Sequence, residues 1–300
     1  MVKRIPPALV AALVSGLCGV ALARGGGRSV VLRSALWTGA GLGAAVTANE
    51  VGGKPVPFLR WSVLRLMLGA KHLLTHWQVG DGREAALADY VVERARQGDL
   101  DDVIRIIDEF SRRKAMLINV GEEKGQILDR AVRRVAARRI LELGTYCGYG
   151  ALRMARATAR DGHVYSIELN PDNAEIARRV IGHAGAEDRV TVVVGSLGDG
   201  GATIRRLRED HGFGEGSVDL VFVDHDKEQY LPDVLRILDS GWLHRGSLVV
   251  GDNIKLPGAP RYLAYLRERE GTTWRTTEHR AHVEYQSLLP DVVTESEYLG

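Results

Sequence analysis

The sequence has few cysteines: its 300 residues contain only Cys18 and Cys147. Two cysteines cannot build a disulfide framework, so the chain fits a reducing compartment best. The hydrophobic share of 45% and the charged share of 26% are close to those of ordinary soluble proteins. A disordered, collagen-like or multi-span membrane protein is therefore excluded as a description of the whole chain.

Acidic residues are almost missing from the first 80 positions, which carry nine basic side chains and one acidic side chain. The rest of the chain carries 31 basic and 37 acidic side chains, so a charge of +8 at the N-terminus stands against −6 in the remainder. This asymmetry argues against a nucleic-acid-binding body. It favours a basic N-terminal segment beside anionic lipid.

The uncharged apolar run from Ala8 to Ala23 is short for a membrane span. As a helix its 16 residues extend about 24 Å, against a hydrocarbon core of about 30 Å. Flanking prolines and snorkelling arginines would help it to span. The small residues at Ala21 and Ala23 also match a signal-peptidase site, so export after cleavage near Ala23 stays an alternative to anchoring.

A second basic stretch, over residues 58–77, mixes leucines and aromatics with arginine and lysine. This pattern suits a helix in the membrane interface, and a core helix with a solvated basic edge explains it equally well. We predict a division into two parts. Residues 1–79 form an N-terminal membrane anchor and basic amphipathic segment, and residues 80–300 form a globular domain.

Beyond residue 80, short apolar runs alternate with helical stretches. Apolar positions at helical spacing predict helices over residues 83–97 and 101–114. The expected strands cover residues 139–143, 164–167, 190–194, 218–223 and 247–250. Strands that alternate with helices form a parallel sheet covered on both faces. Two final runs, near residues 274–277 and 282–288, predict an antiparallel hairpin. The expected fold class is α/β: a doubly wound, Rossmann-like, mostly parallel seven-stranded sheet with a C-terminal antiparallel hairpin.

A glycine-containing turn follows the first predicted strand, in the segment LELGTYCGYG at residues 141–150. Glycines there let the backbone turn tightly and approach a ligand. The second strand ends at Glu168, 24 residues beyond Gly144, where doubly wound folds place an acid on a ribose hydroxyl pair. Alternatively, Glu168 only caps the following Asn-Pro turn. The glycines do not follow the dinucleotide pattern, and Glu142 would repel phosphates, so S-adenosylmethionine fits better than NAD.

Polar side chains follow the fourth and fifth predicted strands. Asp224 ends one, and Asp252 and Asn253 end the other. Open α/β sheets bind ligands at the carboxyl ends of their strands, and two carboxylates with an amide oxygen suit Mg²⁺. Near a divalent cation an ammonium group gives up its proton more easily, so Lys227 is a credible general base. Each acid taken singly is better explained as a helix cap or turn residue, but the acids taken together with Lys227 favour the site.

With these motifs in order, the chain resembles catechol O-methyltransferases over roughly residues 80–290. The resemblance rests on INVGEEKG at 118–125, LELGTYCGYGALRMAR at 141–156, ELNP at 168–171, FVDHDKEQYLPD at 222–233, GDNIKLPGAP at 251–260 and VEY at 283–285. It implies a methyltransferase that moves a methyl group from S-adenosylmethionine to one hydroxyl of a catechol with Mg²⁺. The family's membrane-bound form carries a short N-terminal anchor, which residues 1–79 resemble in kind.

The resemblance also implies roles for single residues. It implies Asp224, Asp252 and Asn253 as metal ligands, Lys227 as the base, Glu284 as the acceptor of the second catechol hydroxyl, and Val120, Gly144, Tyr146, Glu168, Ser196 and His225 as cofactor contacts. Pro257 matches a proline that lines the catechol slot, while the role of Lys124 stays open. Three positions depart from the family: Asp226 and Met116 replace tryptophans at the adenine and the catechol slot, and Leu197 replaces a serine that fixes the adenine, with Ser196 one residue earlier.

Two rival hypotheses remain. One is a catalytically silent S-adenosylmethionine-binding protein tethered to a membrane, and the other is an NAD-dependent oxidoreductase. The metal ligands and Lys227 disfavour the first, and the turn disfavours the second. Because S-adenosylmethionine is a cytosolic metabolite, we expect a membrane-anchored protein with a cytoplasmic catalytic domain. The expected partners are a small catechol substrate and the membrane, without nucleic acid.

Overall fold

The computed structural model describes residues 62, 63, 65 and 78–300. The chain divides into two compact units, residues 1–75 with 79–81 and residues 76–78 with 82–300. In the first unit Arg65 pairs with Asp81 at 3.3 Å. The apolar run at 8–23 and most of the basic stretch at 58–77 lie outside the described residues. Within the described part, no helix is both long and apolar enough to cross a membrane.

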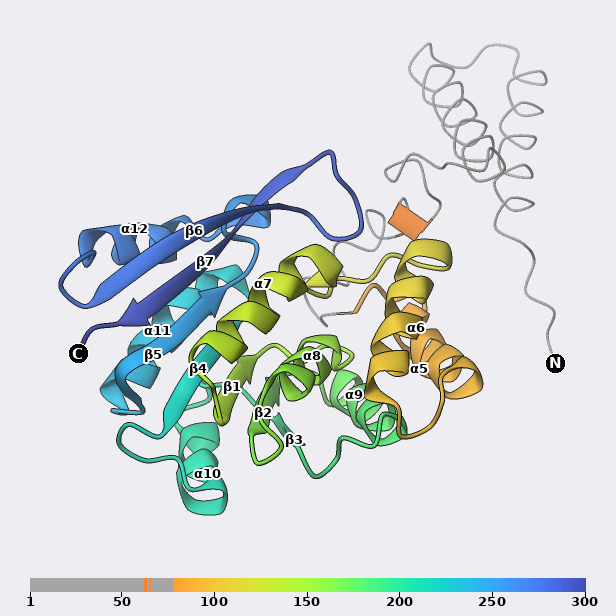
Figure 1. Ribbon diagram of the computed structural model, residues 1–300, viewed down its shortest axis with the longest axis horizontal. Helices are drawn as coiled ribbons and strands as arrows, with labels where there is room; N and C mark the ends of the chain where they lie inside the picture. Colours follow the sequence, from red (N-terminus) through yellow and green to blue (C-terminus); the bar gives the residue numbers. More distant parts are fainter. Residues whose placement is uncertain (1–61, 64, 66–77) are drawn as a thin grey trace, which may run out of the picture. The chain divides into compact units, whose positions relative to one another are not determined.

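A seven-stranded sheet organises the second unit (Figure 1). Its strands are β1 (Arg139–Leu143), β2 (His163–Glu168), β3 (Val190–Val194), β4 (Val218–Val223), β5 (Leu243–Gly251), β6 (Trp274–His282) and β7 (Pro290–Tyr298). The order across the sheet is β3-β2-β1-β4-β5-β7-β6. The first five strands are parallel, and β7 runs antiparallel to both β5 and β6. The predicted doubly wound, mostly parallel sheet with a C-terminal hairpin is therefore confirmed.

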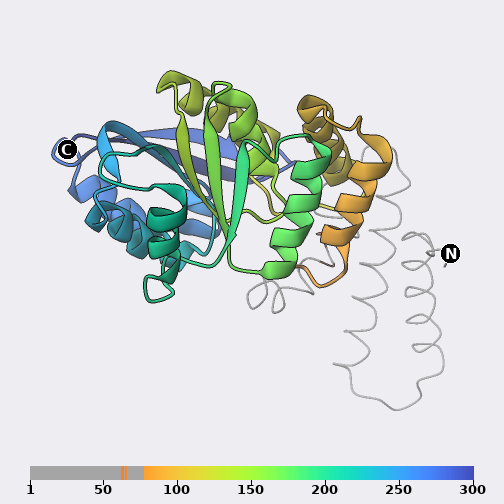
Figure 2. The same cartoon turned by 90° about the horizontal axis from the view of Figure 1, so that it is seen from below.

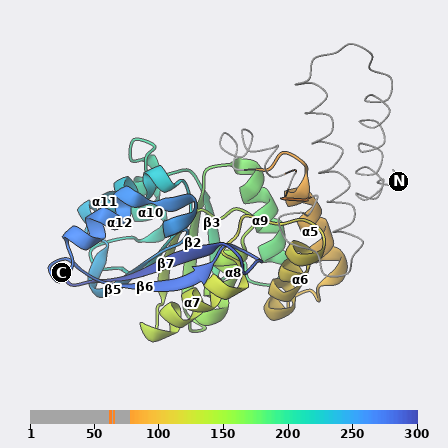
Figure 3. The ribbon, with the colours of Figure 1, turned by 90° about the horizontal axis from the view of Figure 1, so that it is seen from above.

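Helices cover both faces of this sheet (Figure 3). They are α5 (Arg83–Arg94), α6 (Leu100–Arg113), α7 (Gly121–Arg134), α8 (Tyr149–Ala157), α9 (Pro171–His183), α10 (Ala202–His211), α11 (Tyr230–Asp239) and α12 (Pro260–Glu268), with short helical turns η2 (Lys227–Gln229) and η3 (Ile254–Gly258). On one face α7, α8 and α9 pack on the strands, and α5 and α6 pack against α8 and α9; α10, α11 and α12 cover the other face. Figure 2 shows α5 beside α9, where Asp89 and Arg179 pair at 2.7 Å.

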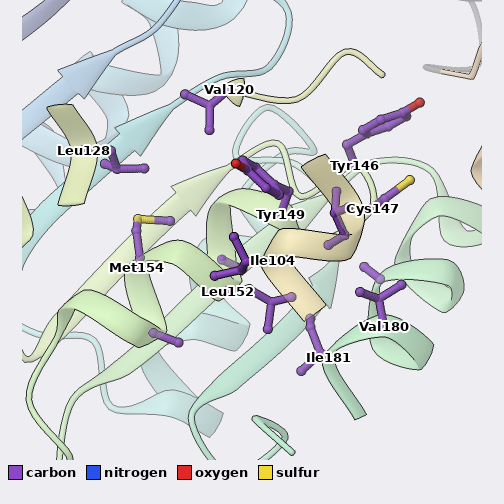
Figure 4. Packing of buried hydrophobic residues seen from close by; sticks show 14 of the residues in the cluster. Ile104, Val120, Leu128, Tyr146, Cys147, Tyr149, Leu152, Met154, Val180 and Ile181 are labelled. Atoms are coloured by element: carbon purple, nitrogen blue, oxygen red, sulfur yellow. The ribbon is translucent and has the colours of Figure 1, made fainter. Parts of the chain in front are cut away.

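Alternating side chains along the strands build the two halves of the core. In β4, Phe222 packs toward α5–α9, whereas Val221 and Val223 pack toward α10–α12. Both halves are apolar because a parallel sheet is covered on both sides. Figure 4 shows part of the first half, in which Tyr149 and Leu152 of α8 lie among side chains of neighbouring helices.

Several predicted boundaries were wrong, and local contacts explain two of them. The first helix ends at Arg94 instead of reaching residue 97, because the chain becomes extended at Ala95. The final strand was expected over residues 282–288 but covers 290–298. In between, the side chain of Gln286 donates to the carbonyl oxygens of Val283 and Leu289 and accepts from two backbone amides, so this segment forms a loop.

Gly144 occupies a position where any side chain would clash. Its φ is +100°, and an added Cβ would lie 2.5 Å from the carbonyl oxygen of Asp224. We expect Gly144→Ala to lower the free energy of unfolding by about 2–4 kcal/mol, because backbone strain and the close contact add. Gly200→Ala is the matched control, with φ +75° and no atom within 4 Å of the added Cβ. Urea denaturation of both variants checks this, and equal losses would contradict the role of the contact.

Candidate functional site

Four parallel strands end side by side at one edge of the sheet and place the predicted residues together. Gly144 and Tyr146 follow β1, Glu168 ends β2, and Asp224 and Asp252 follow β4 and β5. A pocket at this edge is lined by Ile118, Asn119, Val120, Glu142, Gly144, Thr145, Tyr146, Gly150, Phe222 and Asp224. Val120 reaches the pocket from the start of α7, which reasoning from single residues did not anticipate.

The carboxylate of Glu168 accepts hydrogen bonds from the backbone of two turns. One carboxylate oxygen accepts from the amide of Tyr146 at 2.8 Å, and the other accepts from the amide of Asn170 at 2.9 Å. Burial raises the pKa of this carboxyl, while these hydrogen bonds oppose the shift. The capping contact considered as an alternative is present. Contact of this carboxylate with a ribose stays a prediction.

Glu142 is fully buried against the same turn. An added Cβ at Gly150 would lie 2.2 Å from its carboxylate oxygen, so only glycine fits there. The hydroxyl of Ser166 donates to Glu142. Burial raises the pKa of Glu142 well above its ordinary value. The shift favours the uncharged form of this acid, which weakens the argument that its charge repels phosphates.

His225 and Ser196 complete the predicted cofactor set. The imidazole Nε2 of His225 lies 2.9 Å from a carboxylate oxygen of Asp233, and its ring stacks on Tyr230 with centroids 5.3 Å apart. Its Nδ1 is buried without a hydrogen-bond partner in the described part of the chain. Ser196 is half-buried in the turn after β3, whereas the next residue, Leu197, belongs to the apolar core beneath α10–α12.

Two of the predicted metal ligands, Asp252 and Asn253, each keep one oxygen atom that accepts no hydrogen bond in the described part of the chain. Asp252 is fully buried; its Oδ1 accepts from the amide of Asn253 at 2.7 Å and forms an ion pair with Nζ of Lys124 at 2.8 Å. Its Oδ2 is buried and has no hydrogen-bond partner among the described residues. The amide nitrogen of Asn253 donates to Glu284 and Asp291, both at 3.0 Å, which leaves its Oδ1 as an acceptor.

Electrostatics at these ligands follow from burial. Burial raises the pKa of Asp252 to about 7; the nearby Asp224 adds to the shift, and Lys124 opposes it. Burial raises the pKa of Asp224 as well, against the opposing charge of Lys227. No group of three or more His, Cys, Asp or Glu side chains in the described residues is placed to hold a metal ion. The set here has two carboxylates and one amide oxygen, which suits Mg²⁺.

Lys227 lies at the start of η2, directly after β4. Its Nζ donates to Oδ1 of Asp224 at 3.2 Å and to the hydroxyl of Tyr230 at 2.5 Å. That hydroxyl in turn donates to the carbonyl oxygen of Asp252 at 3.0 Å. Asp226 accepts from the amide of Glu228 and caps η2. The side chain of Asp226 is therefore used to cap η2.

Glu284 joins the site from the loop between β6 and β7. Its Oε1 accepts from Asn253 at 3.0 Å and from Lys124 at 2.5 Å. The next residue, Tyr285, has a φ of 55°, and its hydroxyl donates to Asp108 at 3.1 Å. Sequence reasoning left the role of Lys124 open, and Asp291 was missed. A lysine on the apolar face of α7, one turn before Leu128, was the available signal.

Met116 and Pro257, which the resemblance implies at the catechol slot, do not line the pocket at Gly144. The carbonyl oxygen of Met116, a half-buried residue, accepts a hydrogen bond from Arg83. Pro257 lines a groove of about 450 Å³ together with Lys255, Leu263 and Val292. The structure does not place Pro257 among the residues that line the pocket at Gly144.

Comparison with known proteins adds three findings. A sequence family described as O-methyltransferase matches residues 99–260. A probable O-methyltransferase of Mycobacterium tuberculosis is 58% identical over 77% of this chain and 99% of its own length, and catechol O-methyltransferase B of Danio rerio is 40% identical over 73% and 80%. The O-methyltransferase TomG of Streptomyces achromogenes, solved in complex with S-adenosylmethionine, covers 80% of this chain and 99% of its own at 22% identity, with a TM-score of 0.52.

Proposed function

The chain belongs to the O-methyltransferase family of S-adenosylmethionine-dependent enzymes, and we propose that it methylates one hydroxyl of a catechol with Mg²⁺. The observation that carries this proposal is the convergence of Asp224, Asp252 and Asn253 beside Lys227. They follow Val223 and Gly251, which are paired across β4 and β5. Binding S-adenosylmethionine alone requires neither metal ligands nor a base.

The residues divide into two groups with different tasks. We assign S-adenosylmethionine binding to Val120, Gly144, Tyr146, Glu168, Ser196 and His225. The lining of one pocket by Val120, Gly144 and Tyr146 supports this assignment. We assign the metal to Asp224, Asp252 and Asn253, and the unpartnered Oδ2 of Asp252 supports it.

Catalysis then rests on two side chains that face the substrate. Bound Mg²⁺ supplies a Lewis acid that makes a catechol hydroxyl more acidic. Lys227 accepts the proton of the reacting hydroxyl, and its contacts with Asp224 and Tyr230 fix where its Nζ lies. Glu284 accepts a hydrogen bond from the second hydroxyl. A catechol has both hydroxyls and a monophenol only one, so this arrangement favours catechols.

A silent S-adenosylmethionine-binding protein is the competing function. One experiment separates the two: the full-length protein is incubated with labelled S-adenosylmethionine, Mg²⁺ and a panel of catechols and monophenols. We expect label in the catechols alone. Cofactor binding without methylation of any phenol would support the silent protein instead.

We predict that turnover requires a divalent cation. Exhaustive chelation should abolish methylation of the catechol, and added Mg²⁺ should restore it. Asp224→Ala should lower turnover by about 100-fold or more, because a lost ligand removes charge stabilisation and substrate placement together. The matched control is Asp239→Ala, an exposed aspartate at the end of α11, which should behave as the wild type. Full turnover after chelation would refute the metal assignment.

We predict that Lys227 acts as a base and not only as a fixed charge. Lys227→Ala should lower turnover by about 10²- to 10⁴-fold while the affinity for S-adenosylmethionine stays almost unchanged. Lys227→Arg should not rescue turnover, because a guanidinium does not release its proton at any workable pH. Turnover and cofactor binding are measured separately for both variants. Near-normal turnover of the arginine variant would mean that the proton leaves by another route.

We also propose that residues 1–79 anchor the protein to a membrane with the catalytic domain in the cytoplasm. The apolar run at 8–23 and the +8 charge of the first 80 positions support this proposal. After cell fractionation, full-length protein should be found with the membranes, and a chain lacking residues 1–79 should be found in the soluble fraction. An exported protein whose N-terminus begins after Ala23 would favour cleavage instead.

A further inference from the structure

Lys124 is a buried lysine that contacts three carboxylates. It lies in the first turn of α7 with 1% of its side chain exposed. Its Nζ is 2.8 Å from Asp252, 2.5 Å from Glu284 and 3.1 Å from Asp291. It donates hydrogen bonds to Glu284 and Asp291 and forms an ion pair with Asp252.

These partners come from two parts of the fold. Asp252 follows β5, whereas Glu284 lies in the loop that joins β6 to β7 and Asp291 lies in β7 just after this loop. A single ammonium group therefore joins the end of β5 to this loop. Asn253 makes the same connection, since its amide group donates to Glu284 and Asp291. Its hydrogen bonds are weaker than those of Lys124 because the amide group is neutral.

The loop itself is internally braced. Gln286 closes it with hydrogen bonds to Val283, Leu288 and Leu289. Asp291 accepts from the amides of Lys255 and Leu256 through its other oxygen, both at 3.1 Å. A loop closed by its own side chain keeps its shape, so its contacts with Lys124 and Asn253 determine where Glu284 lies.

We propose that Lys124 is a positioning residue, which sets the separation of Glu284 from the metal ligand Asp252 and thereby decides which catechol hydroxyl is methylated. This inference rests on the proposed function. Lys227 and the metal ligands hold the reacting hydroxyl, and Glu284 holds its neighbour. A shift of Glu284 changes the angle at which the ring sits, and misplacement by about 1 Å is enough to lower turnover by about 100-fold.

A purely structural role is the alternative that the experiment must separate. Removing Lys124 leaves three carboxylates close together without their shared cation, which destabilises a protein wherever the group lies. Two variants address this. Lys124→Met removes the charge, and Lys124→Arg keeps the charge but presents its donors in a planar fork. Lys114→Met is the control, since Lys114 is exposed at the end of α6.

Three quantities are measured on the full-length protein. They are hydrogen exchange of the amides of residues 283–291 without ligands, the ratio of the two monomethylated products of 3,4-dihydroxybenzoate, and the affinity for S-adenosylmethionine. In Lys124→Met we expect hydrogen exchange of the amides in this segment to rise by about tenfold, because the segment opens locally more often without its contacts to Lys124. In both variants we expect the product ratio to change by about threefold or more and the catechol KM to rise by about tenfold. Cofactor affinity should change less than about twofold, because Lys124 is outside the cofactor pocket.

The outcomes are distinct. An unchanged product ratio in Lys124→Arg, with exchange and KM as in the wild type, would overturn the proposal and leave Lys124 as a neutralising charge. If Lys124→Met does not fold, the arginine variant decides alone. A wild type that methylates no catechol would refute the proposed function, while the exchange measurement would still decide whether Lys124 holds the loop.

Discussion

Parallel pairing of β2, β1, β4 and β5 is the constraint on which the site depends. Because these strands run in one direction, their carboxyl ends lie at one edge of the sheet. Residues more than 100 positions apart in the chain, such as Tyr146 and Asp252, therefore reach the same region. Close approach of the turns follows from this, as the contact between Gly144 and the carbonyl group of Asp224 shows. Helices on both faces keep that edge fixed.

Concentrating acids at this edge has an electrostatic cost. Burial raises the pKa of Asp224, Asp252 and Glu142, since a low dielectric disfavours their charged forms. Burial alone would lower the pKa of Lys124, but the negative charges of Asp252 and its neighbours outweigh that effect and raise it. Lys124 and Lys227 thus oppose the shift at Asp224 and Asp252. Strain gathers here too: of four non-glycine residues with positive φ in the described part, three are Tyr146, Asn253 and Tyr285.

Much of the fold was predictable because it follows from local patterns. Apolar runs separated by helical spacing located five parallel strands, three of them with the observed bounds. The final strand was misplaced by several residues because residues 283–289 are as apolar as a strand, and only the side chain of Gln286 reveals the loop. Asp224 and Asp252 were found from their places after strands. Lys124, Glu284 and Asp291 were not found from single residues, since their contacts join positions about 160 apart.

The departures from the family pattern concern adenine packing and substrate choice and leave the residues assigned to the transfer unchanged. Transfer to a hydroxyl needs oxygen and nitrogen atoms at fixed positions, and all of the assigned metal ligands and the assigned base match the pattern. By the resemblance, Asp226, Leu197 and Met116 stand in the walls around the adenine and the substrate ring, so these departures concern adenine packing and substrate choice. A methionine has three rotatable bonds where the family has a rigid indole, so it adapts to a substrate's shape. Under the proposed function we therefore expect bulkier or less planar catechols to be accepted.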